Sequence, residues 1–264
     1  MSNVLNDKLH PLAYADEGFM NSTGARSLRI LSEYLKPLSV FRREKIRDTI
    51  VFFGSARITE QGPMARYYAE SRELSRLITE WCQGLDNPNH RFVVCTGGGP
   101  GIMESANRGA NDAGGKTIGL NIRLPFEQFA NPYISTELSF DFHYFFMRKF
   151  WFAYLAKALI VFPGGFGTMD EMFEVLTLTQ TKKLRKQMVT LLYGSAFWKE
   201  VINFEALVKH GVIGAEDMEL FRFVDTPQEA FEVLRDFLVE NYVKPEKPLP
   251  AREYETPAIA ESRT

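Results

Sequence analysis

The sequence predicts an α/β fold: a single Rossmann-like domain with a doubly wound parallel sheet flanked by helices. Three observations support this fold class. From residue 49 onward, short β-rich runs alternate with longer amphipathic stretches, which is the pattern of βαβ units. Residues 158–162 are apolar throughout, as expected for a central parallel strand buried on both faces. Glycine-rich turns at 97–101 and 163–167 each stand between an expected strand and an expected helix.

The first half of the expected sheet lies between residues 49 and 122. Pro63 suits a first helical turn, and the apolar residues after it recur about every 3.6 positions, so we expect a helix at 63–82. A second helix begins at residue 102 and is closed by Gly114 and Gly115. The strands around these helices are expected at 49–54, 91–96 and 116–122.

The second half continues the alternation to residue 242. Residues 124–135 contain two prolines and are expected to form a loop, whereas the strongly aromatic stretch 142–156 is expected to be a helix. The remaining strands are expected at 137–142, 158–162, 187–193 and near 221–224, and the remaining helices at 172–181, 196–211 and 227–242.

Two segments flank the domain expected at 49–242. Residues 1–48 are expected to form an N-terminal helical arm, in which a helix at 27–36 is stopped by Pro37. This arm should pack on the core or on a second subunit. Residues 243–264 are rich in proline and charge, which indicates an extended or disordered tail.

The composition argues against several classes of protein. The net charge of -2, from 31 basic and 33 acidic residues, does not suit a nucleic-acid-binding protein. No signal peptide is recognisable, and no apolar run approaches the ~20 residues of a membrane span, so we expect a cytoplasmic protein without membrane contact. Cys82 and Cys95 form no CxxC pair, which fits a reducing compartment.

Several common site motifs fail on spacing. A dinucleotide-binding GxGxxG motif would need glycine where Ile102 or Glu104 stands, which disfavours an NAD-dependent enzyme. Residues 109–117 resemble a Walker A loop but have one residue too many, and they close a helix rather than open one. No GxSxG or HExxH motif is present. The four histidines are scattered and are interpreted as surface or packing residues: His10, His90, His143 and His210.

The two glycine-rich turns predict a phosphate-binding site. In a doubly wound fold both turns lie at the carboxyl ends of strands, where ligands bind. Glycine lets the backbone approach an anion, and the helix that follows supplies free N–H groups and a positive dipole end. Glycines that only permit tight turns are the alternative interpretation of each turn taken singly.

The second turn continues into Thr168 and Glu171, which fit a helix capping box. In that interpretation Glu171 lies in the first helical turn, where the dipole favours its ionised form. The same carboxylate could instead be catalytic. Arg148 and Lys149 stand in the aromatic stretch and need an anionic partner or a route to the surface. In one interpretation they form structural ion pairs with carboxylates. In the other, Arg148 points to the carboxyl edge of the sheet, within reach of Glu171.

Three motifs taken together resemble the LOG (Lonely Guy) family of nucleoside 5'-monophosphate phosphoribohydrolases, also described as lysine decarboxylases. They are GGGPGIMESANRGA, MRK and PGGFGTMDE, the last of which matches PGGxGTxxE. The resemblance covers roughly residues 50–192 and excludes the arm and the tail. The sequence GIMESANRGA after the first glycine turn differs from that of the short plant-like members and looks like the longer bacterial subgroup.

The resemblance implies which residues form the site. Arg148 and Glu171 would be the catalytic pair. The substrate-binding residues would be Gly54, Ser55, Gly97, Gly98, Gly99, Met147, Lys149, Gly164, Gly165, Gly167 and Thr168. The implied reaction is hydrolysis of the N-glycosidic bond of AMP-like or cytokinin riboside monophosphates, giving free base and ribose 5-phosphate.

The implied reaction needs no metal and no redox cofactor. The small-molecule substrate would be the main partner, and we expect a homodimer or higher homo-oligomer. Lysine decarboxylation would need an electron sink such as PLP on a lysine, and nothing singles out Lys116 or Lys149 for that role. A non-catalytic nucleotide-binding protein, similar to molybdenum-cofactor carriers, is the alternative, because fold alone does not fix function.

Overall fold

The fold is described from a computed structural model. The structure describes residues 10–85, 89–123, 130–184 and 186–244. Most of the tail expected at 243–264, and the first half of the loop expected at 124–135, therefore lie outside the described residues. No helix among the described residues is both long enough and apolar enough to span a membrane.

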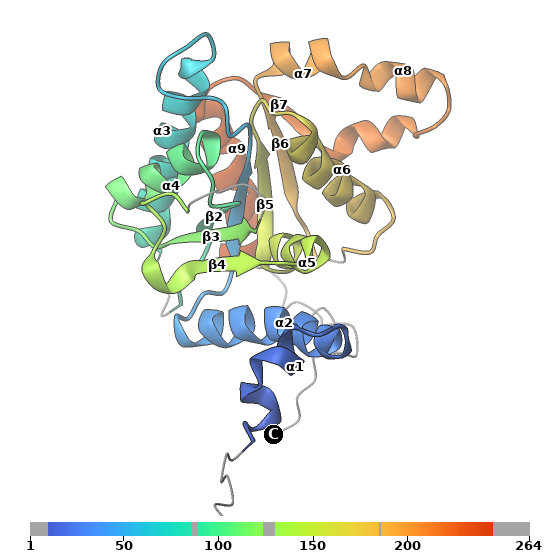
Figure 1. Cartoon of the computed structure of the whole chain (residues 1–264). Coiled ribbons are helices and arrows are strands. Elements are labelled where there is room, and N and C mark those ends of the chain that lie inside the picture. The colour runs from blue at the N-terminus through green and yellow to red at the C-terminus, as the bar shows by residue number, and fades with distance from the viewer. Residues whose placement is uncertain (1–9, 86–88, 124–129, 185, 245–264) are drawn as a thin grey trace, which may run out of the picture.

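A seven-stranded sheet forms the centre of the described chain, with every strand parallel to its neighbours (Figure 1). The expected parallel α/β fold is confirmed. The spatial order is β4-β3-β2-β1-β5-β6-β7. The strands are β1 (Thr49–Phe53), β2 (Val93–Thr96), β3 (Thr117–Ile122), β4 (Ser139–Phe142), β5 (Ala156–Val161), β6 (Val189–Tyr193) and β7 (Arg222–Val224).

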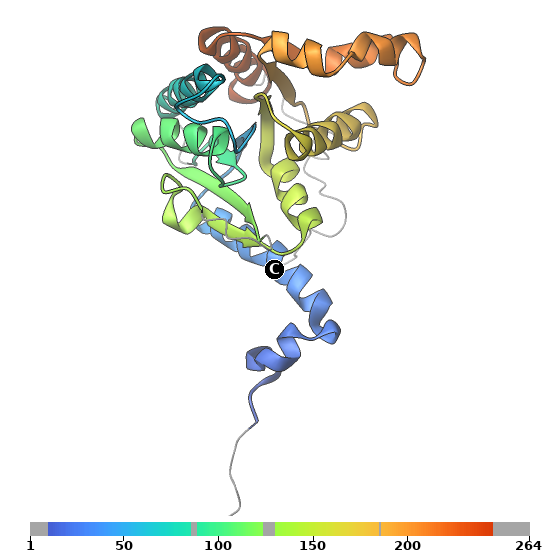
Figure 2. The ribbon, with the colours of Figure 1, turned by 45° about the horizontal axis from the view of Figure 1, so that its top comes forward.

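Helices cover both faces of this sheet (Figures 1 and 2). Helices α3, α4 and α9 bury their apolar side chains against one face, and α2, α5, α6, α7 and α8 contribute to the core on the other. The α-helices of the described residues are α1 (Glu17–Asn21), α2 (Arg26–Arg43), α3 (Ala65–Gln83), α4 (Ile102–Asp112), α5 (Phe145–Leu155), α6 (Phe166–Gln180), α7 (Ser195–Val201), α8 (Phe204–Lys209) and α9 (Pro227–Leu238).

The strand order creates a topological switch point between β1 and β5. The chain builds outward from β1 through β2 and β3 to β4, and then returns to the other side of β1 for β5. The connections that leave the carboxyl ends of β1 and β5 consequently diverge. Ligands of open α/β sheets bind in the crevice formed at such a point.

Helix α2 of the N-terminal arm runs straight through Pro37, so the expected helix stop there is wrong. A proline has no N–H and leaves the carbonyl four residues earlier without its helical partner. Here that carbonyl belongs to Glu33, and it accepts a hydrogen bond from the indole Nε1 of Trp151 at 3.0 Å. Tyr34 stacks on the same indole, and Phe41 packs edge-on against it. The arm therefore packs on the core through α5.

Two further element predictions need correction. The single helix expected at 196–211 is two helices, because Ile202 is extended and the side chain of Asn203 caps α8 by accepting from the Ala206 amide at 2.9 Å. Helix α3 begins at Ala65, so Pro63 precedes the helix and does not occupy its first turn. At the end of α4, Gly114 adopts a positive φ of 71°, which confirms the expected stop.

Candidate active site

The turn after β1 joins the two glycine-rich turns at the switch point. The Ser55 amide donates to the Pro163 carbonyl at 3.0 Å, and the Ser55 carbonyl accepts from the Ile102 amide at 3.2 Å. Gly54 allows this approach, because a Cβ there would lie 2.6 Å from the Ile102 side chain. The expected grouping of the three turns at one edge of the sheet is therefore present in the structure.

A buried polar network holds the first glycine turn, Gly97 to Gly99. The hydroxyl of Thr96 accepts from the Gly98 amide at 2.9 Å and donates to Asn107 Oδ1 at 2.7 Å. Asn131 Nδ2 lies 3.1 Å from both the Gly98 and the Gly99 carbonyl oxygen, to which it donates. Gly98 has a positive φ of 74°, a conformation that favours glycine. This network fixes the turn beside the catalytic candidates.

The second glycine turn opens α6 at Phe166, with Gly165 as the N-cap residue. The expected capping box is therefore wrong, because the helix begins before Thr168, which occupies its third position, and no side chain caps the end. The first amides of a helix have no intrahelical acceptor, and they point outward where an anion can accept from them. A Cβ placed on Gly165 or Gly167 would meet nothing within 4 Å, so space adjoins these amides.

Gly164 serves a different purpose in the same turn. A Cβ there would lie 2.5 Å from the Cβ of Thr168, which is itself buried. Gly164 is thus required for the turn to close on α6, whereas Gly165 and Gly167 leave room on the outside.

Helices α5 and α6 bring Arg148 and Glu171 together. Arg148 Nη1 lies 3.7 Å from Glu171 Oε1, and the two side chains are only 13% and 9% exposed. Arg148 Nε donates to the Leu120 carbonyl at 2.8 Å, and its guanidinium lies 5.0 Å from the ring centroid of Phe152. A Cβ on Gly97 would come within 2.5 Å of Arg148 Nη2, so the guanidinium lies directly against the first glycine turn.

Burial dominates the electrostatics of this pair. It raises the pKa of Glu171, and the nearby positive charges of Arg148 and Lys149 do not fully offset that effect. Burial also lowers the pKa of Arg148, although Glu171 acts in the opposite direction. Glu171 lies in the second turn of α6, and not in the first turn as the capping box implied, so it is further from the positive end of the helix dipole.

The other two residues of the MRK motif have partners within the protein. Lys149 forms ion pairs with Asp170 at 2.8 Å and Glu174 at 2.7 Å, both on α6. These hydrogen bonds raise the pKa of Lys149 although burial opposes them. Met147 is buried in the core on the α5 face of the sheet. Contact of either residue with a substrate remains a prediction.

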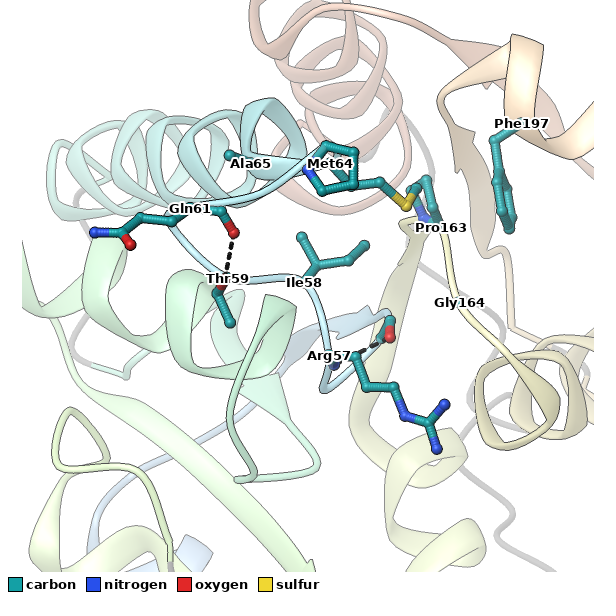
Figure 3. A pocket seen from close by; sticks show the side chains of 11 residues that line it. Arg57, Ile58, Thr59, Gln61, Met64, Ala65, Pro163, Gly164 and Phe197 are labelled. Atoms are coloured by element: carbon teal, nitrogen blue, oxygen red, sulfur yellow. Dashed lines mark hydrogen bonds between the residues drawn. The ribbon is translucent and has the colours of Figure 1, made fainter.

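A cavity of about 230 Å³ adjoins the turn after β1 and the second glycine turn (Figure 3). Ser55 and Gly164 form part of its wall, and Ile58, Met64 and Phe197 contribute apolar surface. The catalytic candidates do not line it. Its wall also includes an exposed cation that the motif analysis missed, Arg57, two residues after Ser55. In the sequence, only its position directly after the Gly54–Ser55 turn could have indicated it.

Fold and site together define a class of α/β protein in which glycine-rich turns meet at the switch point of a parallel sheet, beside a buried Arg–Glu pair. The chain belongs to the LOG family: the family model described as possible lysine decarboxylase matches residues 103–234, half of the chain.

Two plant relatives share this family. The cytokinin riboside 5'-monophosphate phosphoribohydrolase LOG of Oryza sativa is 28% identical over 202 residues, which cover 75% of this chain and 77% of the relative. A phosphoribohydrolase of the same description from Arabidopsis thaliana is 25% identical over 199 residues, covering 74% of this chain and 85% of the relative.

A solved structure supports the fold alone. The molybdenum cofactor binding protein of Rippkaea orientalis superposes with a TM-score of 0.51 at 16% identity, covering 74% of this chain and 98% of that protein. At such low identity the likeness extends to the arrangement of the sheet and helices and carries no functional argument.

Proposed function

We propose that the protein hydrolyses the N-glycosidic bond of nucleoside 5'-monophosphates, releasing the free base and ribose 5-phosphate. The observation that carries this proposal is the buried Arg148–Glu171 pair, 3.7 Å apart, next to the open N-terminus of α6. The activity of the rice relative supports the same reaction class. AMP-like nucleotides and cytokinin riboside monophosphates are the proposed substrates.

The proposed mechanism begins with the phosphate on the free amides of α6. Binding energy gained at the phosphate positions the ribose near Glu171, less than two helical turns further along α6. As the bond between C1' and the base nitrogen breaks, positive charge develops on the ribose, and the Glu171 carboxylate stabilises it. A water molecule then bonds to C1' and gives a proton to the Glu171 carboxylate, while the departing nucleobase takes up a proton from the solvent, to which Glu171 later returns its own.

Arg148 has two roles in this scheme. It opposes the effect of burial on the pKa of the Glu171 carboxyl and so favours the charged form. Its own position is fixed by the hydrogen bond to the Leu120 carbonyl, so the carboxylate is held at a defined place. Decarboxylation of lysine has less support, because Lys149 and Lys116 both lie in ion pairs with carboxylates.

We further propose that the protein acts as a cytoplasmic homo-oligomer. Helix α2 supports this proposal with three leucines that recur along one side of the helix and are about half exposed: Leu28, Leu31 and Leu35. A second copy of the chain would cover this apolar stripe.

The test of the reaction is direct. The protein is incubated separately with AMP, GMP, CMP, UMP and a cytokinin riboside monophosphate, and released base is quantified by chromatography. We expect base from at least one nucleotide, and no base from Glu171→Gln under the same conditions. Glu232→Gln, an exposed glutamate on α9, is the matched control. Nucleotide binding without release of any base would favour a carrier over a hydrolase.

A further inference from the structure

The positive charges of Arg148 and Lys149 are already compensated by carboxylates of α6. Arg148 faces Glu171, and Lys149 lies between two carboxylates of α6. A 5'-phosphate, however, carries about -1.5 to -2 charges at neutral pH. Helix amides supply only partial charge, equivalent to about half an elementary charge at the helix N-terminus. A cation without a carboxylate partner would balance the remaining charge of such a phosphate.

Arg57 meets this requirement. Its backbone N–H donates to the Ser55 hydroxyl at 3.1 Å, so the residue is held in the turn that bonds to Pro163. Within the described residues no carboxylate forms an ion pair with its guanidinium, whereas Arg108 nearby pairs with Glu60. Arg57 is exposed, so its charge is available to a ligand without displacing an internal partner.

The direction of the side chain fits the same role. Arg57 shares the cavity wall with Ser55 and Gly164, which belong to the turns on either side of the switch point. Figure 3 shows its side chain pointing away from Ile58 and Met64, which form the apolar part of that wall. A guanidinium is suited to this position, because its fork of N–H donors binds two oxygens of one phosphate.

We propose that Arg57 binds the 5'-phosphate and thereby selects nucleotides over nucleosides. This inference rests on the proposed function and deepens it, since it names the group that recognises the phosphorylated class of substrate. Lys149, which pairs with Asp170 and Glu174, then has a positioning role between α5 and α6.

The experiment compares Arg57→Gln with the wild type on AMP and on adenosine. We expect KM for AMP to rise about 10- to 100-fold, as for loss of a hydrogen-bonded charge, with kcat little changed. Inhibition by inorganic phosphate should weaken by a similar factor, whereas turnover of adenosine should not change. Arg57→Lys should recover part of the affinity. Arg222→Gln, which removes an exposed arginine at the start of β7, controls for net charge.

Binding measurements separate this inference from the hydrolysis proposal. Calorimetry with AMP and adenosine is performed on Glu171→Gln with and without Arg57→Gln, so that no turnover occurs. If the wild type releases no base but binds AMP, hydrolysis is refuted while these titrations still decide the role of Arg57. Unchanged affinity for AMP, or an equal loss for AMP and adenosine, would overturn the assignment. Thermal unfolding checks that the exposed substitution leaves the fold intact.

Discussion

Replacing Arg148 and Glu171, singly and together, separates their catalytic role from their contribution to stability. The attraction between the two charges across 3.7 Å is about 4 kcal/mol at an effective dielectric constant near 20. Burying two such ions costs several kcal/mol each. The penalty therefore matches or exceeds the attraction, in agreement with pKa shifts of both groups toward their neutral forms.

The free energy of unfolding of the double variant Arg148→Met with Glu171→Gln should consequently equal that of the wild type or exceed it, by up to ~4 kcal/mol. Arg148→Met alone leaves a buried carboxylate with Lys149 as its remaining cationic neighbour and should cost about 3–5 kcal/mol at pH 8. Its deficit should shrink at pH 5. Because burial raises the folded-state pKa of Glu171, the stabilisation from this group is complete below the unfolded pKa and is lost as pH rises through the folded pKa.

The assay is urea unfolding at pH 5 and pH 8, paired with release of base from AMP. The double variant should release none while remaining folded. A double variant destabilised by more than about 2 kcal/mol would show that the pair stabilises the fold. It would refute the argument that burying the two charges costs at least as much free energy as their attraction supplies.

Three other outcomes follow from the site and the arm. Gly167→Ala should stabilise the protein by up to ~1 kcal/mol in urea unfolding but raise KM for AMP, since its Cβ enters the space left for the phosphate. The acid limb of kcat/KM should lie above the ordinary glutamate pKa of about 4.3, because burial raises the pKa of Glu171. Trp151→Phe should cost about 1–3 kcal/mol in thermal unfolding by leaving the Glu33 carbonyl without a partner, and Pro37→Ala should reduce that cost by restoring a helical N–H.

Those features that depend on neighbouring residues in the chain were predictable from the sequence. The apolar run of β5 and the alternation of strands and helices predicted a parallel sheet, because burial on both faces leaves a direct trace in composition. The glycine turns were predictable for the same reason, since their position between a strand and a helix is set by local sequence. Arg148 and Glu171 were paired through the resemblance, and the structure brings them to 3.7 Å.

The features that depend on distant neighbours were not predictable. Helix α2 passes Pro37 because an indole more than a hundred residues away bonds the freed carbonyl. The start of α6 depends on the extended backbone of Gly165, so a sequence that fits a capping box did not form one. The ion pairs of Lys149, and the lack of a carboxylate partner for Arg57 within the part of the chain that the structure describes, likewise depend on which helices and turns meet in space.

The measurement that tests the central claim most directly is the rate of adenine release from AMP by the wild type and by Glu171→Gln, with both proteins shown to be folded. We expect release by the wild type and a loss of at least about 100-fold in the variant, as for removal of a catalytic acid–base group. Equal rates for the two proteins would contradict the assignment of Glu171 as the catalytic carboxylate.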